Sequence, residues 1–226
     1  MKVAVLGKGK TGSKVIDVLD EQRISYTVFD SKNIPTIENL KGHHVAISFL
    51  AGEPFSNYIE LLIQANILVV SGTTGFTYSN ELKKQLKEKK QKWIVANNFS
   101  LGMNLIQQMI KTLGKAELLV KDPEFKIHEV HHTKKLDAPS GTALSWEKWL
   151  DHKATITSDR TGDVIGFHEI TLTTGTEEIK LSHNALDRKI FAEGAVWAAK
   201  KIFNNQSIPY GLNYFQDIVE NIIEKE

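Results

Sequence analysis

The chain has 226 residues, 41% of them hydrophobic and 24% charged, which is typical of a soluble globular protein with room for one large or two small domains. Its formal net charge of +1 provides no basic footprint, so neither nucleic acid nor a membrane surface is expected as a partner. The absence of cysteine excludes disulfides and cysteine nucleophiles, and agrees with a cytoplasmic location. The first residues, MKVAVLGKGK, are apolar too briefly for a signal peptide or a membrane span.

A dinucleotide-binding pattern begins directly after the first predicted strand. Residues 2–6 form a short apolar run, and the sequence GKGKTG follows at 7–12. A helical pattern over 13–22 and a second strand over 24–29 then lead to Asp30. Together these features predict a glycine turn that approaches a pyrophosphate and a carboxylate that accepts hydrogen bonds from the ribose. The predicted contacts are Gly7, Lys8, Gly9, Lys10, Thr11, Gly12 and Asp30.

Two other interpretations of this glycine turn were considered. Glycine also serves tight strand-to-helix turns for purely structural reasons, so the prediction depends on the flanking strands, helix and acidic residue. A phosphate-binding P-loop requires lysine after the last glycine, where this chain has Ser13. The P-loop interpretation therefore fails.

Strands and helices continue to alternate through the first hundred residues. The alternation predicts a doubly wound parallel sheet of Rossmann type, with ligands beyond the carboxyl ends of its strands. The loops after the fourth and fifth strands either line a nicotinamide pocket or are ordinary turns. Strands are expected over 43–50, 67–72 and 92–97, and helices over 55–66 and 80–90. The candidate cofactor contacts in the two loops are Gly72, Thr73, Thr74, Asn97, Asn98 and Phe99.

The pattern changes after Ser100, where a long helix over 101–118 is expected to lead into a second domain. Polar and apolar residues alternate in the strands beyond it, which predicts a sheet with one open face. Residues 101–190 are therefore expected to form a smaller α+β domain with a mixed, open sheet that binds substrate. The strands are expected over 125–132, 164–174 and 177–185, and helices over 189–203 and 212–223. The helices of 191–226 are expected to complete the dinucleotide-binding domain of residues 1–100.

Titratable residues gather in the sequence EVHHTKKLDAPSGT at 129–142. His131 and His132 are adjacent on a predicted strand, so they should point to opposite faces and have different roles. Their divergence, without any cysteine, argues against a metal site. A histidine pair of this kind is often only solvated surface.

A predicted helix start follows the two histidines. Ser140 is a good N-cap residue, and Gly141 and Thr142 would then present free backbone N–H groups that suit a carboxylate. Lys135 adds a positive charge just upstream. The segment therefore predicts a receptor for an anionic substrate beside a histidine able to move a proton.

The sequence EVHHTKKLDAPSGTAL resembles the signature of the dihydrodipicolinate reductase family, E-x-H-H-x-x-K-x-D-x-P-S-G-T-A, at every fixed position. The resemblance extends over nearly the whole chain. The further similar segments are SGTTGF at 71–76, NFSLGMN at 98–104, RTGDVIGFH at 160–168, SHNALDR at 182–188 and FAEGAVWAA at 191–199.

The resemblance implies reduction of 4-hydroxy-tetrahydrodipicolinate by NADH or NADPH in diaminopimelate and lysine biosynthesis. It also implies a homotetramer, with residues 101–190 as the oligomerisation domain. It implies acid/base duty for His131, and proton donation with substrate contact for Lys135. It also implies that His132 and the Ser140–Thr142 turn bind the carboxylates of the cyclic substrate.

The chain departs from the family at three points. The glycine turn is one residue shorter than usual, and Ser31 and Leu50–Ala51 stand where basic residues commonly contact a phosphate. These losses predict a preference for NADH over NADPH, although Lys8, Lys10 or Lys32 can take their place. The chain is also short, and a strand-bearing segment ahead of Arg160 is expected to be missing, which puts the tetramer contacts in question.

Two rival functions remain open. Another two-domain NAD(P)-dependent dehydrogenase of amino-acid intermediates would share the fold, but it has no need of the histidine and PSGTA block. A non-catalytic dinucleotide sensor would be expected to have lost His131 or Lys135, and the chain keeps both.

Overall fold

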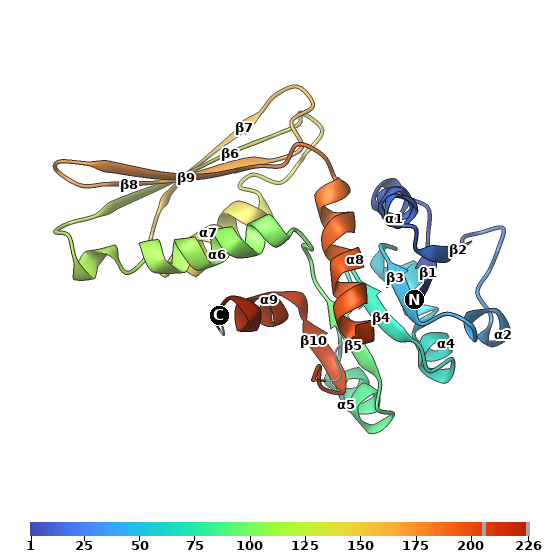
Figure 1. Ribbon diagram of the computed structural model, residues 1–226. Coiled ribbons are helices and arrows are strands. Elements are labelled where there is room, and N and C mark those ends of the chain that lie inside the picture. The colour runs from blue at the N-terminus through green and yellow to red at the C-terminus, as the bar shows by residue number, and fades with distance from the viewer. Residues whose placement is uncertain (205–206, 225–226) are drawn as a thin grey trace. The chain divides into compact units, whose positions relative to one another are not determined.

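The structure is a computed structural model that describes residues 1–204 and 207–224. The chain divides into two compact units (Figure 1): unit 1 comprises Met1–Leu101 and Arg188–Glu226, and unit 2 comprises Gly102–Asp187. Unit 1 contains a six-stranded sheet and unit 2 a four-stranded sheet. The predicted α/β class is confirmed. Within the described residues, no helix is both long and apolar enough to cross a membrane.

The sheet of unit 1 is parallel throughout, in the order β10-β5-β4-β3-β1-β2. Strand β1 therefore lies between its two successors, and the chain passes to β2 on one side and to β3 on the other. In such sheets the ligand crevice lies where the strand order reverses, beyond the carboxyl ends of the strands. The strands are β1 (Lys2–Leu6), β2 (Ser25–Phe29), β3 (Val45–Ser48), β4 (Leu68–Ser71), β5 (Lys92–Val95) and β10 (Gly211–Tyr214).

Helices cover both faces of this sheet (Figure 1). Alternate side chains of β1 point to opposite faces, so that Val3 and Val5 pack with α1, α8 and α9, and Ala4 and Leu6 pack with α2 to α5. The two apolar layers hold the sheet in the predicted doubly wound form. The helices are α1 (Lys10–Glu21), α2 (Ile37–Leu40), α3 (Gly52–Ser56), α4 (Ile59–Gln64), α5 (Asn80–Glu88), α8 (Lys189–Asn204) and α9 (Phe215–Ile223).

Two predicted helices of unit 1 have different bounds. The helix expected over 55–66 is divided into α3 and α4. The helix expected over 212–223 begins only at Phe215, because residues 212–214 belong to β10 and pair with the edge of the sheet at β5. Short apolar segments with aromatic residues fit both periodicities, so only the pairing partner decides between them.

The sheet of unit 2 is mixed and has the order β7-β6-β8-β9. Strands β6 and β7 run parallel, and the other pairs are antiparallel. Helices α6 and α7 cover one face (Figure 1), where Trp146 and Ile127 are fully buried. The predicted mixed, open sheet is therefore confirmed. The elements are β6 (Glu124–His131), β7 (Thr155–Arg160), β8 (Phe167–Thr173), β9 (Glu178–Asn184), α6 (Leu101–Leu113), α7 (Gly141–Leu150) and the 3₁₀ helix η1 (Ala116–Leu118).

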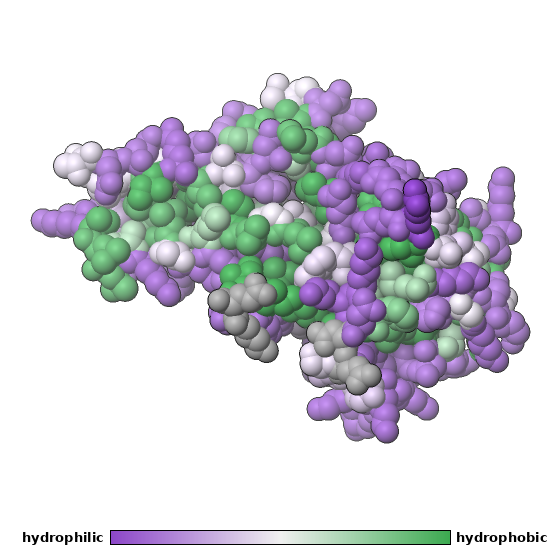
Figure 2. Space-filling model, in the orientation of Figure 1, coloured by the Kyte–Doolittle hydropathy of each residue, from purple (hydrophilic) through white to green (hydrophobic). Residues whose placement is uncertain are grey.

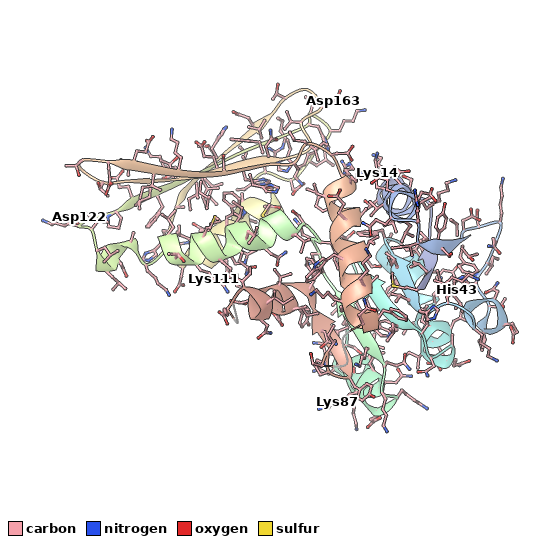
Figure 3. The ribbon with its side chains drawn as sticks, in the orientation of Figure 1. Lys14, His43, Lys87, Lys111, Asp122 and Asp163 are labelled. Carbon is pink, nitrogen blue, oxygen red and sulfur yellow. The ribbon has the colours of Figure 1, made fainter. Side chains whose placement is uncertain are left out.

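Unit 2 also corrects one expectation. The helix expected over 101–118 ends at Leu113, and η1 follows as a separate turn. Arg160 is the last residue of β7, which pairs with β6 at the sheet edge and was not among the expected strands. Asp122 and Asp163 lie at opposite ends of this sheet (Figure 3), just before β6 and just after β7. The carboxyl ends of the two parallel strands therefore meet at the Asp163 end.

Candidate active site

The glycine turn between β1 and α1 leaves no room for side chains at two positions. Gly7 has φ +89°, and a Cβ there would lie 2.6 Å from Leu50 Cδ2. A Cβ at Gly12 would lie 2.2 Å from the carbonyl oxygen of Gly7. Gly9 precedes α1 without a side-chain cap, and Lys8 and Lys10 are exposed. The turn therefore presents uncapped N–H groups and two cations, as a pyrophosphate site requires.

The Asp30 carboxylate is fixed directly after β2. Its Oδ1 accepts hydrogen bonds from the backbone N–H groups of Lys32 and Asn33, at 2.8 and 3.1 Å. These two bonds lower the pKa of Asp30, and the charges of Lys32 and Lys8 lower it further. An ionised carboxylate thus lies at the carboxyl edge of the sheet, where the sequence predicts a ribose contact.

The loops after β4 and β5 are more tightly built than the sequence indicates. Ser71 Oγ donates to Thr73 Oγ1 at 2.9 Å, and a Cβ at Gly72 would meet the Phe49 ring at 2.2 Å. Thr73 is buried, whereas Thr74 is exposed.

The Asn97–Phe99 loop also combines exposed and buried residues. Asn98 Oδ1 accepts a hydrogen bond from the N–H of Ser100 at 2.8 Å, and Asn97 is exposed. Phe99 is only 1% exposed, and its ring packs on that of Phe215 with centroids 4.7 Å apart. Its side chain therefore belongs to the core of unit 1, and only the backbone of Phe99 is open to a role in a pocket.

A buried carboxylate, Glu129, lies at the centre of the candidate site in unit 2. Arg160 donates to both of its oxygens, at 2.8 Å to Oε1 and 3.0 Å to Oε2. Oε1 also accepts the backbone N–H of Ser140 at 3.1 Å, and Oε2 is hydrogen-bonded to His131 Nδ1. Burial raises the pKa of Glu129, but bonds from Arg160, Ser158 and His131 outweigh it and lower the pKa to about 2. The carboxylate is therefore ionised at neutral pH.

His131 ends β6 and is 7% exposed. Burial lowers its pKa, and the charges of Lys135 and Arg160 act in the same direction, although Glu129 opposes them. The ring is therefore neutral at pH 7, as a group that is to accept a proton needs to be. Its Nε2 faces Gly166, where a Cβ would lie only 3.1 Å away.

Ser140, at the start of α7, is hydrogen-bonded to residues of two strands, Glu129 of β6 and His168 of β8. Ser140 Oγ accepts the N–H of Ala143 at 3.1 Å, so the predicted N-cap is confirmed. The same oxygen lies 3.1 Å from Nε2 of His168, whose burial lowers its pKa to about 3. Gly141 is exposed and Thr142 half-buried at the first helical positions. This helix end presents N–H groups to a carboxylate beside His131.

The loop between β6 and α7 carries the other predicted residues. Lys135 Nζ donates to both oxygens of Asp137, at 2.7 and 2.8 Å, which lowers the pKa of Asp137. His132 lies one residue beyond β6, and its buried Nδ1 has no hydrogen-bond partner among the described residues. His131, His132, Lys135 and the Ser140–Thr142 turn thus come from one continuous segment.

Three residues of this network were not assigned from the sequence: Glu129, Arg160 and His168. Each nevertheless stands in a quoted segment, Glu129 in EVHH and the other two in RTGDVIGFH. Glu129, His131 and His168 also have possible metal-ligand atoms within 4.8 Å of one another. The Arg160 cation on both carboxylate oxygens opposes a metal there, so the donor set fits proton transfer better.

Comparisons with known proteins agree over nearly the whole chain. The family descriptions "Dihydrodipicolinate reductase, N-terminus" and "Dihydrodipicolinate reductase, C-terminus" match residues 1–99 and 102–216. A 4-hydroxy-tetrahydrodipicolinate reductase of Thermosipho africanus is 33% identical, covering 97% of this chain and 98% of the relative. Another, from Pelagibacter ubique, is 30% identical over 91% of this chain and 88% of its own.

Solved structures share the fold. A dipicolinate-bound dihydrodipicolinate reductase from Paenisporosarcina sp. TG-14 has a TM-score of 0.78 at 23% identity, covering 96% of this chain and 99% of that chain. Aspartate semialdehyde dehydrogenase II of Vibrio cholerae, at 14% identity, covers 91% of this chain and 99% of that chain with a TM-score of 0.56. Enzymes with different reactions thus share this two-unit architecture, so the reaction has to be inferred from the site residues.

Proposed function

Since the chain belongs to the dihydrodipicolinate reductase family, we propose that it reduces 4-hydroxy-tetrahydrodipicolinate to tetrahydrodipicolinate with NADH or NADPH, in diaminopimelate and lysine biosynthesis. The observation that carries the proposal within unit 2 is a neutral, buried histidine, His131, beside an N–H-lined helix start. A dicarboxylate that must receive a proton needs both.

The residues of unit 2 bind the substrate and move its proton. The N–H groups of Gly141 and Thr142 receive one carboxylate, with His132 as a further contact. Lys135, at present paired with Asp137, supplies a cation that favours negative charge developing on the ring. Loss of the 4-hydroxyl group as water leaves a conjugated imine ring, which takes up the hydride and one proton. His131 Nε2 and Lys135 are the two candidate donors of that single proton.

The residues of unit 1 hold the nicotinamide dinucleotide, whose chemical contribution is the hydride. Gly7–Gly12 and the start of α1 receive the pyrophosphate, and Asp30 receives the ribose. The loops Gly72–Thr74 and Asn97–Phe99 follow strands β4 and β5 and line the remainder of the dinucleotide site. The Leu50 side chain fills the position of a Cβ at Gly7, and the carbonyl oxygen of Gly7 fills that position at Gly12. Both glycines therefore allow the tight turn that brings the start of α1 close to the end of β1, where the pyrophosphate is proposed to bind.

The reaction is tested by a coupled assay. Pyruvate and aspartate semialdehyde are condensed by a dihydrodipicolinate synthase, and the loss of NADH or NADPH absorbance is followed when this protein is added. Turnover above the rate without the protein supports the proposal. Folded protein that binds NADH but turns over neither cofactor would show that the substrate is wrong although the dinucleotide site is right.

The preferred cofactor is proposed to be NADH. A ribose phosphate adds negative charge beside the ionised Asp30, whereas the ribose hydroxyls donate hydrogen bonds to it. We expect NADH to bind at least as tightly as NADPH. Asp30→Ala should weaken NADH binding about tenfold, the cost of one hydrogen bond to a charged group, and weaken NADPH less. Fluorescence titration of both cofactors measures this, with exposed Asp17→Ala on α1 as the control. Wild-type protein that binds NADPH ten times more tightly than NADH would contradict the preference.

We also propose that the protein forms a homo-oligomer, with a tetramer as the expected state. Apolar side chains gather over α6 and η1 on the surface (Figure 2), where Leu105 and Met109 are each 50% exposed and Leu119 is 89% exposed. A contiguous apolar patch of this kind usually marks a contact surface. Size-exclusion chromatography with light scattering should give a mass near four times 25.4 kDa, and a monomer at micromolar concentration would contradict the proposal.

A further inference from the structure

One carboxylate connects the two functional parts of the site in unit 2. Glu129 Oε2 is bonded to His131 Nδ1, and Oε1 accepts the N–H of Ser140 at 3.1 Å, where α7 begins. We propose that Glu129 is a positioning residue: it selects the ring nitrogen of His131 that carries the proton, and it fixes that ring relative to the helix start. This inference rests on the proposed function.

The selection follows from what an ionised carboxylate can do. Both oxygens of Glu129 already accept hydrogen bonds from Arg160, so they offer only acceptor sites to the histidine. His131 Nδ1 must therefore donate, and a neutral imidazole has only one N–H. The lone pair is then on Nε2, on the side of the ring that faces Gly166. Nε2 is the nitrogen left to take up a proton and to give it to a substrate.

Arg160 keeps the carboxylate in this orientation. Its two terminal nitrogens bind the two oxygens of Glu129 separately, which prevents rotation of the carboxylate. The same nitrogens also donate to the backbone oxygens of Asp159 and Asp137, so the guanidinium is itself fixed by β7 and by the loop between β6 and α7. A lysine has no such fork and cannot bind both oxygens in this way.

The alternative is that Glu129 and Arg160 form a purely structural ion pair. The tautomer of His131 and the kcat of the Glu129→Gln variant distinguish this structural role from the positioning role. In Glu129→Gln the amide keeps the size of the side chain but can donate to Nδ1, which favours the opposite tautomer. In serine proteases, the equivalent change at the aspartate behind the catalytic histidine lowers kcat by about 10⁴-fold through the wrong tautomer. A structural role would change stability alone.

The experiment records the ¹⁵N resonances of the histidine rings at pH 7.5 in the full-length protein, with His131 assigned from a His131→Gln variant. In wild type we expect a neutral His131 with its proton on Nδ1. In Glu129→Gln we expect the proton on Nε2, kcat lowered at least about hundredfold and KM changed less than about threefold, as for loss of a group that acts only in proton transfer. The control is Glu124→Gln on the exposed face of the same strand, which should change neither.

A wild-type His131 that carries its proton on Nε2 would overturn the proposal, as would a Glu129→Gln protein with full kcat and a lower melting temperature. Should Glu129→Gln fail to fold, the wild-type spectrum still decides the tautomer by itself. The spectrum needs no substrate. A wild-type protein with the proton on Nδ1 but no turnover would therefore reject the reaction and leave the positioning role standing.

Discussion

Replacing His131 with alanine is expected to lower kcat about 10²- to 10⁴-fold, the usual contribution of a general acid or base. The reason is specific to its position. His131 is buried, neutral and hydrogen-bonded through Nδ1, so that its other nitrogen is held ready for proton transfer. The side chain lies within unit 2, and NADH binding to unit 1 should therefore remain within about twofold of wild type.

The coupled assay measures the first effect and a fluorescence titration with NADH the second. His128→Ala is the matched control, since His128 lies on the same strand, is partly exposed and contacts Thr157 at the open face of the sheet. We expect its kcat to stay within about twofold of wild type, as for a surface substitution away from the site. A loss of less than tenfold in His131→Ala, with the control unchanged, would remove His131 from the proton-transfer step.

Replacing Arg160 with leucine should lower the free energy of unfolding by about 3–5 kcal/mol at pH 7, because it leaves the fully buried Glu129 ionised without its partner. Urea denaturation followed by tryptophan fluorescence measures the difference. The control is Lys180→Leu, which removes the cation of an exposed pair with Glu178 in the same sheet. That exposed pair should contribute much less to stability, because water screens it. Equal losses in the two variants would contradict the special role of the buried pair.

The same pair predicts how stability depends on pH. The folded pKa of Glu129 is about 2, below its usual value of 4.5, so its contribution is fully present above pH 4.5 and is lost as the pH falls toward 2. Wild type should therefore lose more stability than Arg160→Leu between pH 5 and pH 3. A constant gap between the two proteins over that interval would show that the arginine stabilises the fold in some other way.

The first unit was largely predictable because its elements have regular periodicities. Apolar runs such as Val3–Leu6 are buried on both sides, and such runs identify central parallel strands without knowledge of their neighbours. Strand β7 was missed for the opposite reason. Its sequence TITSDR is polar and its residues alternate between exposed and half-buried, so it is a strand only because β6 supplies the partner backbone.

The site divides in the same way. His131, Lys135 and Ser140 lie on one segment, and their chemistry could be interpreted from spacing and helix capping. Glu129 and Arg160 are 31 residues apart in the sequence and come into contact only because β6 and β7 pair. Their role could therefore not be inferred from the sequence. For Phe99, a loop position suggested a cofactor contact, whereas its ring is buried by Phe215 from the other end of the chain. Long-range packing of this kind leaves no local signal.

The division of unit 1 between Met1–Leu101 and Arg188–Glu226 has a consequence for how the protein is made. During synthesis the first hundred residues emerge without α8, whose Ala195 and Val196 complete the apolar layer over α1 and β3, and without the edge strand β10. That apolar layer stays uncovered until all of unit 2 has been translated. Unit 2 is one continuous segment, so it can fold during that time. A premature stop before residue 188 would therefore leave one side of the nucleotide-binding core open, and we expect such a fragment to be retained by chaperones or degraded.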